Sequence, residues 1–220
     1  SQGGLVKILR DLGQTESALA SCKALLATNE QRLCEFGVTA ENLRDISFSQ
    51  GMVADILSDQ GQPEETLTLY QASLTTYEQI ISEFGATNEY LRELSILQGG
   101  VANILCDQDQ TEAALELYSA SLSTAEYIIR EFGRTEWHIL DVIFAQKKVA
   151  ETLMMQNKFK KAVMNFQQII VKIESLETEF NDGSLAHGYK DEIQSKIDDC
   201  IGKCKIVSFK AELVTEPYKI

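Results

Sequence analysis

Cysteine and histidine are the residues of this 220-residue chain whose spacing could most readily support chemistry. Cys200 and Cys204 are four residues apart, which places two sulfurs one helical turn apart, where they could share a metal ion. A structural zinc site normally needs four ligands, and the sequence offers no nearby residues that complete the set. Asp198 and Asp199 adjoin the pair but would point to different helix faces. We therefore expect the cysteines to be buried in a helix and predict no metal site.

The residues available for catalysis are also few. The chain has two histidines, His138 and His187, and contains no glycine-rich phosphate loop, nucleophile elbow or His-Glu-x-x-His pair. Carboxylates could still serve as general acids or bases, because 33 residues are acidic. We expect a protein that is not an enzyme and uses no cofactor.

Charge and composition narrow the classes of partner. The formal net charge is -13, so the electrostatic field of the protein should repel nucleic acid and anionic membrane surfaces. An acidic surface also keeps a protein dispersed, which is a purely physical alternative to a basic partner. The five cysteines are an odd number at apolar helical positions, which favours a reducing compartment, and we expect a cytoplasmic protein. No stretch approaches 18 apolar residues, and only two prolines occur, which favours helices.

The elements that would position any site are set by an internal repeat. The tripeptide Glu-Phe-Gly occurs at residues 35–37, 83–85 and 131–133, and Glu-Phe recurs at 179–180, so the period is 48 residues. The spacing predicts two domains, a repeat array over residues 1–180 and a capping helix with a tail over 181–220. The array divides into a partial repeat and three full ones, at residues 1–36, 37–84, 85–132 and 133–180.

Each full repeat is predicted to form two helices. Glycine ends one helix, and Thr39, Thr87 or Thr135 begins the next by accepting a hydrogen bond from a backbone N–H. Pro63 is placed to open a second helix. One apolar stripe is predicted for that helix, at Leu67, Tyr70, Leu74, Tyr77, Ile81 and Phe84. We interpret the aromatic residues Tyr70, Tyr118 and Phe166, which share one repeat position, as core residues.

The repeat resembles the tetratricopeptide repeat (TPR) over about residues 3 to 180. The family pattern of small, turn and aromatic positions is occupied here by Ala54, Leu57, Gly61, Thr66 and Tyr70, and then by Ala102, Leu105, Asp109, Ala114 and Tyr118. The family repeat has 34 residues, so this is a long variant whose helices are each about two turns longer. The resemblance implies an all-α, right-handed superhelical solenoid of antiparallel helix pairs with a C-terminal capping helix.

The resemblance also implies a binding surface, because the first helices of TPR arrays line a concave groove. The candidate partner-binding residues are Phe48, Asp55, Asp59, Ile96, Asn103, Asp107, Lys147 and Glu151. This set is acidic in the middle and has one lysine toward its C-terminal end. Such a groove would suit a protein or peptide that carries Lys or Arg, although the carboxylates could equally be a solvated face.

The C-terminal region is predicted to begin with a turn at residues 181–183 and to continue as an amphipathic helix with Ile193, Ile197 and Ile201. Residues 207–213 alternate apolar and polar side chains, so they could be an extended segment or a helix extension.

The function predicted from these features is a non-catalytic protein-interaction module or scaffold. The alternative is a ligand- or peptide-sensing regulatory domain of a larger multidomain protein or a secreted effector. Exposed apolar end faces of the solenoid could also produce a homodimer.

Overall fold

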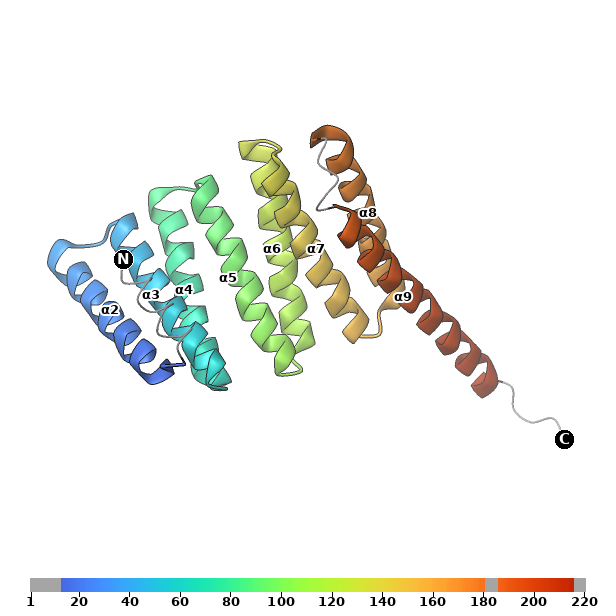
Figure 1. The fold of residues 1–220 in the computed structure, drawn as a ribbon, viewed down its shortest axis with the longest axis horizontal. Helices are drawn as coiled ribbons and strands as arrows, with labels where there is room; N and C mark the ends of the chain where they lie inside the picture. The colour runs from blue at the N-terminus through green and yellow to red at the C-terminus, as the bar shows by residue number, and fades with distance from the viewer. Residues whose placement is uncertain (1–12, 181–185, 216–220) are drawn as a thin grey trace. The chain divides into compact units, whose positions relative to one another are not determined.

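The structure is a computed structural model that describes residues 13–180 and 186–215, and those ranges hold eight helices and no strand (Figure 1). The helices are α2 (Thr15–Phe36), α3 (Ala40–Asp59), α4 (Pro63–Phe84), α5 (Asn88–Asp107), α6 (Thr111–Phe132), α7 (Glu136–Met155), α8 (Phe159–Phe180) and α9 (Ala186–Thr215). The predicted turn at 181–183 and the first part of the partial repeat lie outside the described residues. The all-α fold of helix pairs expected from the sequence is confirmed.

The helices keep the period of the sequence. The first helices of the full repeats, α3, α5 and α7, begin at Ala40, Asn88 and Glu136, and each has 20 residues. The second helices, α4, α6 and α8, also begin 48 residues apart, and each has 22 residues. The repeat therefore fixes where each of these helices starts and stops.

The Glu-Phe-Gly signature marks the end of a second helix. Gly37, Gly85 and Gly133 have φ values of +81°, +90° and +93°, a region that favours glycine. The N–H of Gly37 donates to the carbonyl oxygen of Leu33 at 2.9 Å, which satisfies one of the last free carbonyls of α2. The predicted helix ends are confirmed.

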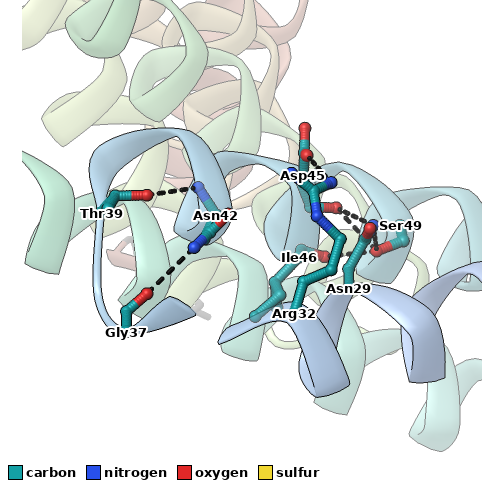
Figure 2. A network of polar contacts seen from close by, with 8 residues as sticks. All are labelled: Asn29, Arg32, Gly37, Thr39, Asn42, Asp45, Ile46 and Ser49. Carbon is teal, nitrogen blue, oxygen red and sulfur yellow. Dashed lines mark hydrogen bonds and ion pairs between the residues drawn. The ribbon is translucent and has the colours of Figure 1, made fainter. Parts of the chain in front are cut away.

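Threonine begins the first helices, as predicted. Thr39, Thr87 and Thr135 each accept a hydrogen bond at their side-chain oxygen from the backbone N–H three residues later, at 3.1, 3.1 and 3.2 Å. Figure 2 shows this contact for Thr39, together with a second bond in which the Asn42 amide donates to the carbonyl oxygen of Gly37 at 2.9 Å. Two hydrogen bonds therefore hold the turn between α2 and α3.

The turn inside a repeat uses a left-handed residue. Gly61, Asp109 and Asn157 occupy the same repeat position and have φ values of +69°, +60° and +57°. Glycine adopts this conformation freely, and Asp and Asn tolerate it better than most other residues. The turn position identified through the TPR resemblance at Gly61 and Asp109 is therefore correct, and Asn157 repeats it in the last repeat.

Two compact units make up the chain, an N-terminal unit of residues 1–104 and a C-terminal unit of residues 105–220. In the N-terminal unit, α2 packs on α3 and α3 packs on α4. Leu97 of α5 joins Leu43, Tyr77 and Ile80 in one buried cluster. In the C-terminal unit, α6 packs on α7, α7 packs on α8 and α8 packs on α9 (Figure 1).

The apolar stripe predicted for α4 is only partly right. Tyr77 is buried, but Phe84 is 44% exposed, and the other predicted members are half-buried. The side chains that α4 buries are Thr66, Ser73, Tyr77 and Ile80. The prediction missed the hydroxyl residues because hydrophobicity alone does not identify places where neighbouring helices approach too closely for a large side chain.

Helix α9 settles the open question about the C-terminal segment, because its backbone is helical through Thr215 and the extended alternative is wrong. Ile193 and Ile197 are buried as predicted, whereas Ile201 is 40% exposed. Cys200 is buried, and burial raises the pKa of its thiol. A raised thiol pKa opposes formation of the thiolate that a metal would need.

Candidate partner-binding groove

A groove of about 510 Å³ lies in the N-terminal unit, where α3, α4 and α5 come together. Helix α3 supplies Phe48, Gly51 and Asp55, while Tyr70 comes from α4 and Ile96 from α5. We call this the α3–α5 groove. Its size is within the range of pockets that bind small ligands or single side chains of a partner.

Two small residues form the base of the groove. Ser47 of α3 and Ser73 of α4 are buried, and each hydroxyl lies within hydrogen-bonding distance of the other residue's carbonyl oxygen, at 3.3 and 3.1 Å. These contacts satisfy both hydroxyls away from water. The short side chains bring α3 and α4 together and leave space above them.

Apolar side chains stand at the sides of the groove. Phe48 is 59% exposed and Ile96 is 58% exposed, and both line the groove. Large apolar side chains that border a concavity are typical anchors of a protein interface. The groove therefore offers apolar area that folding alone does not cover.

The charged residues of the groove are four carboxylates and one arginine. Arg44 pairs with Glu89 at 2.8 Å, and Asp45 pairs with Arg32 of α2 at 2.9 Å. The other two carboxylates, Asp55 and Glu93, have no salt bridge to a described residue. The groove thus keeps a negative potential after its own ion pairs are formed.

Tyrosines lie beside these two carboxylates. The Tyr70 hydroxyl donates a hydrogen bond to Asp55, which fixes the carboxylate at the groove wall. Tyr77 is buried, and burial, together with the charge of Glu93, raises the pKa of its phenol to about 12. The Tyr77 phenol therefore stays neutral at physiological pH, and both tyrosines line the groove.

A polar network between α2 and α3 holds α3 in place (Figure 2). The side-chain amide of Asn29, in α2, donates to the backbone carbonyl of Asp45 at 3.0 Å and to the Ser49 hydroxyl at 3.2 Å. The Ser49 hydroxyl donates back to the Asp45 carbonyl at 2.7 Å. Because Asn29 and Ser49 are both buried, the network fixes how α3 sits on α2 and so positions the groove wall.

Three of the eight candidate residues from the sequence meet in this groove, namely Phe48, Asp55 and Ile96. Asp59 is the last residue of α3 and does not line the groove. Asn103 and Asp107 are exposed in the C-terminal part of α5 and are not among the residues that line the groove.

The remaining two candidates, Lys147 and Glu151, lie in α7 of the C-terminal unit, where α9 engages both. Lys147 pairs with Glu192 at 2.7 Å, and Glu151 pairs with Lys196 at 2.5 Å. Burial alone would lower the pKa of Lys147, but the hydrogen bond to Glu192 and the nearby carboxylates raise it overall. The Lys147 hydrogen bond likewise lowers the pKa of Glu192.

Sequence reasoning missed several residues of the groove. Tyr118 and Phe166 are buried as predicted, but Tyr70, at the same repeat position, lines the groove, so its interpretation as a core residue is incomplete. Gly51 and Glu93 also line the groove and were not candidates. The sequence did contain a signal at Tyr70. Phe166 fills the same repeat position without a hydroxyl, so the hydroxyl of Tyr70 is not needed for packing and indicates a separate role.

No group of three or more His, Cys, Asp or Glu side chains in the described part of the chain is placed to hold a metal ion. None of the described helices combines the length and the apolar character needed to span a bilayer.

No protein-family model and no curated protein sequence matches the chain. Solved structures do match its fold. A putative kinesin light chain from Podosopora anserina with nearly identical TPR-like repeats has a TM-score of 0.61 and 17% identity, over 94% of this chain and 95% of that one. The yeast histone chaperone Hif1, a scaffold protein recruiting protein complexes to core histones, has a TM-score of 0.60 and 15% identity, over 90% and 93%.

BtubC (BKLC) from P. vanneervenii has a TM-score of 0.61 and 12% identity, and the match covers 100% of this chain and 82% of that chain. At these identities the comparisons concern the fold. Together with the helix pairs, caps and turns described above, they show that the chain is an all-α repeat protein with a TPR-like fold.

Proposed function

We propose that this chain is a non-catalytic protein-interaction module, or scaffold, that binds a segment of a partner protein in the α3–α5 groove. The observation that carries the proposal is the groove itself, in which Phe48 and Ile96 are exposed beside a concavity of about 510 Å³. A partner's apolar side chain would gain about 25 cal/mol for each Å² of apolar surface that it buries there.

The partner segment is basic as well as apolar. Asp55 and Glu93 leave the groove negative, and the whole chain has a formal charge of -13, which would steer a basic segment toward it. An extended or helical segment that carries one apolar anchor and one Lys or Arg fits this chemistry.

The similar structures support a role in binding proteins. Hif1 is described as a scaffold protein, and the putative kinesin light chain is described as having TPR-like repeats. Fold likeness does not by itself define a function, so the proposal depends on the groove. Asp59, Asn103, Asp107, Lys147 and Glu151 stay predicted partner contacts, and a homodimer through end faces stays a prediction.

Affinity capture from a cell lysate tests the proposal. The bait is the intact chain, compared with a Phe48→Ala, Ile96→Ala double variant and with a Phe144→Ala, Val171→Ala control. The control residues are also exposed apolar side chains but lie outside the groove. We expect a partner that is captured by the intact chain and the control and lost from the groove variant. A partner retained by all three baits contradicts the proposal.

A further inference from the structure

The repeat allows the groove to be compared with its own counterpart in the same chain. Helices α3 and α4 begin 96 residues before α7 and α8, so residues 96 apart occupy the same repeat position. Helix α9 continues this register after α8, because the ion pairs Lys147–Glu192 and Glu151–Lys196 join residues 45 apart, as does Arg44–Glu89. The α7–α8–α9 arrangement is therefore the internal counterpart of α3–α4–α5.

The counterpart is occupied by the chain's own lysines. The Lys147 ammonium lies 2.7 Å from the Glu192 carboxylate and 5.1 Å from the centre of the Tyr189 ring. Lys196 pairs with Glu151 at 2.5 Å. The residues below are also larger, since Ile143 and Ile169, both buried, stand where the α3–α5 groove has Ser47 and Ser73.

Both lysines are missing from the α3–α5 groove, although carboxylates remain. Gly51 stands at the position of Lys147, and Gly100 stands at the position of Lys196. Asp55 stands at the position of Glu151, so a carboxylate is kept there. Glu93 stands at the position of Tyr189 and adds a second carboxylate. Ile96 stands at the position of Glu192, so the second acid of the groove comes from Glu93, three residues earlier in α5. The groove thus keeps two carboxylates and lacks the two lysines.

The two glycine positions differ in the space around them. A Cβ atom built on Gly51 would meet no atom within 4 Å beyond the adjacent residues and backbone of its own helix, so this position is open to the groove. A Cβ on Gly100 would meet the Tyr70 ring at 3.8 Å, and the Tyr70 hydroxyl takes the place of Lys196 as the donor to the acid. Only the Lys147 position is therefore left empty.

We infer that the α3–α5 groove receives one cationic side chain, Lys or Arg, from the partner, in the space over Gly51 that Lys147 fills in the counterpart. Asp55 and Glu93 supply the carboxylates, and the Tyr70 and Tyr77 rings line the space that the aliphatic stem enters. Arg44 does not oppose this, because Glu89 neutralises it at 2.8 Å. The inference rests on the proposed function and adds the chemistry of one subsite.

A substitution that restores the internal lysine tests the inference. In Gly51→Lys, the new side chain should occupy the subsite from within and exclude the partner's cation. Gly99→Lys is the matched control, since Gly99 is the equivalent residue of the next repeat, has open space around it and does not line the groove. Both changes replace a helical glycine with lysine, so they have similar effects on helix propensity and net charge.

The probe is a set of peptides selected on the intact chain from a displayed library of random 12-residue sequences, resynthesised with a fluorophore. We expect the selected peptides to share a Lys or Arg near an apolar residue. Binding measured by fluorescence anisotropy should weaken at least about tenfold in Gly51→Lys and stay unchanged in Gly99→Lys. Replacing the peptide lysine with norleucine should also weaken binding at least about tenfold, because it removes the charge-assisted hydrogen bonds.

The outcomes separate the two proposals. If Phe48→Ala with Ile96→Ala abolishes binding while Gly51→Lys and norleucine leave it unchanged, the groove binds peptides but the cationic subsite is wrong. Peptides that bind regardless of Phe48 and Ile96, or a library without any enriched peptide, contradict the proposed function and the inference with it. The norleucine measurement uses the unaltered protein, so it decides the question even if Gly51→Lys unfolds.

Discussion

The Nδ1 atom of His138, near the start of α7, lies 2.7 Å from the carbonyl oxygen of Gly133, the glycine that follows α6. Asn42 makes the same contact with Gly37 at 2.9 Å. A carbonyl oxygen can only accept, so His138 donates from Nδ1 as Asn42 donates from its amide. The histidine is buried, and its hydrogen bond holds the turn between α6 and α7.

This contact predicts different effects for two substitutions of His138. His138→Ala should lower the free energy of unfolding by about 1–3 kcal/mol, because it leaves a cavity and removes a donor from the Gly133 carbonyl. His138→Asn should recover most of that loss, because Asn42 already makes the equivalent bond. Urea unfolding followed by circular dichroism measures both. Equal losses in the two variants would contradict a hydrogen-bonding role.

The left-handed turns predict a stabilising change at Asp109. Asp109→Gly should raise the free energy of unfolding by about 0.5–1 kcal/mol, since glycine adopts the φ of +60° without steric cost and Gly61 has the same conformation. Gly61→Ala should lower it by about 1 kcal/mol for the same reason. Urea midpoints at constant m value report both changes. A stabilised Gly61→Ala variant would show that this turn does not require the left-handed conformation.

The buried phenol of Tyr77 predicts a loss of stability in alkali. Its pKa rises from 10.0 to about 12 on folding, so the folded state holds the proton more tightly. The stabilisation is fully present below pH 10 and is lost as the pH rises from 10 toward 12. Burial also raises the pKa of Tyr118, which contributes in the same direction. In Tyr77→Phe, the urea midpoint should fall less steeply than in the parent between about pH 9.5 and about pH 11.5, where the Tyr77 phenol begins to titrate. A variant as steep as the parent would refute the assignment.

The small residue Ala114 predicts a packing limit in α6. Its side chain is fully buried, so Ala114→Arg should lower the free energy of unfolding by at least about 1–3 kcal/mol through overpacking and the burial of a charge. Ala24→Arg, on an exposed position of α2, is the control and should change stability by less than about 0.5 kcal/mol. Melting temperatures give a first comparison, and an unchanged value for Ala114→Arg would count against the repeat alignment.

The sequence predicted those parts of the fold that depend on local chemistry. Glycine after Phe36, threonine at 39 and proline at 63 each specify a backbone conformation or a capping bond, and each occupies the expected place. A repeat multiplies such signals, because every copy must satisfy the same local geometry. Helix boundaries were therefore predictable without any knowledge of tertiary contacts.

Features that depend on contacts between helices were less predictable. Ser73 is buried because it pairs with Ser47 across two helices, and no pattern within α4 indicates that. Gln146 is buried in α7 and receives a hydrogen bond from Lys172 at 2.8 Å, while burial lowers the pKa of that lysine. A polar residue on an apolar face suggests solvent exposure until its partner on another helix is known.

The candidate site shows the same division. The TPR resemblance identified Phe48, Asp55 and Ile96 as facing one surface, and these three line the groove. The resemblance did not identify which part of that surface is hollow. The hollow exists because Ser47, Ser73 and Gly51 have small side chains or none, and so leave volume unfilled. Small residues become informative only when their larger counterparts, such as Ile143 and Lys147, are compared with them.

The constant spacing of helix starts has a consequence for how a gene for such a chain can change. Because the helix that begins at Ala40 and the one that begins at Asn88 have equal lengths and equivalent ends, a duplication or deletion of 48 codons would join matching helix interiors. Every cap and left-handed turn would be retained in the product. Unequal recombination would therefore lengthen or shorten the array by whole repeats, without passing through an intermediate that has a broken helix.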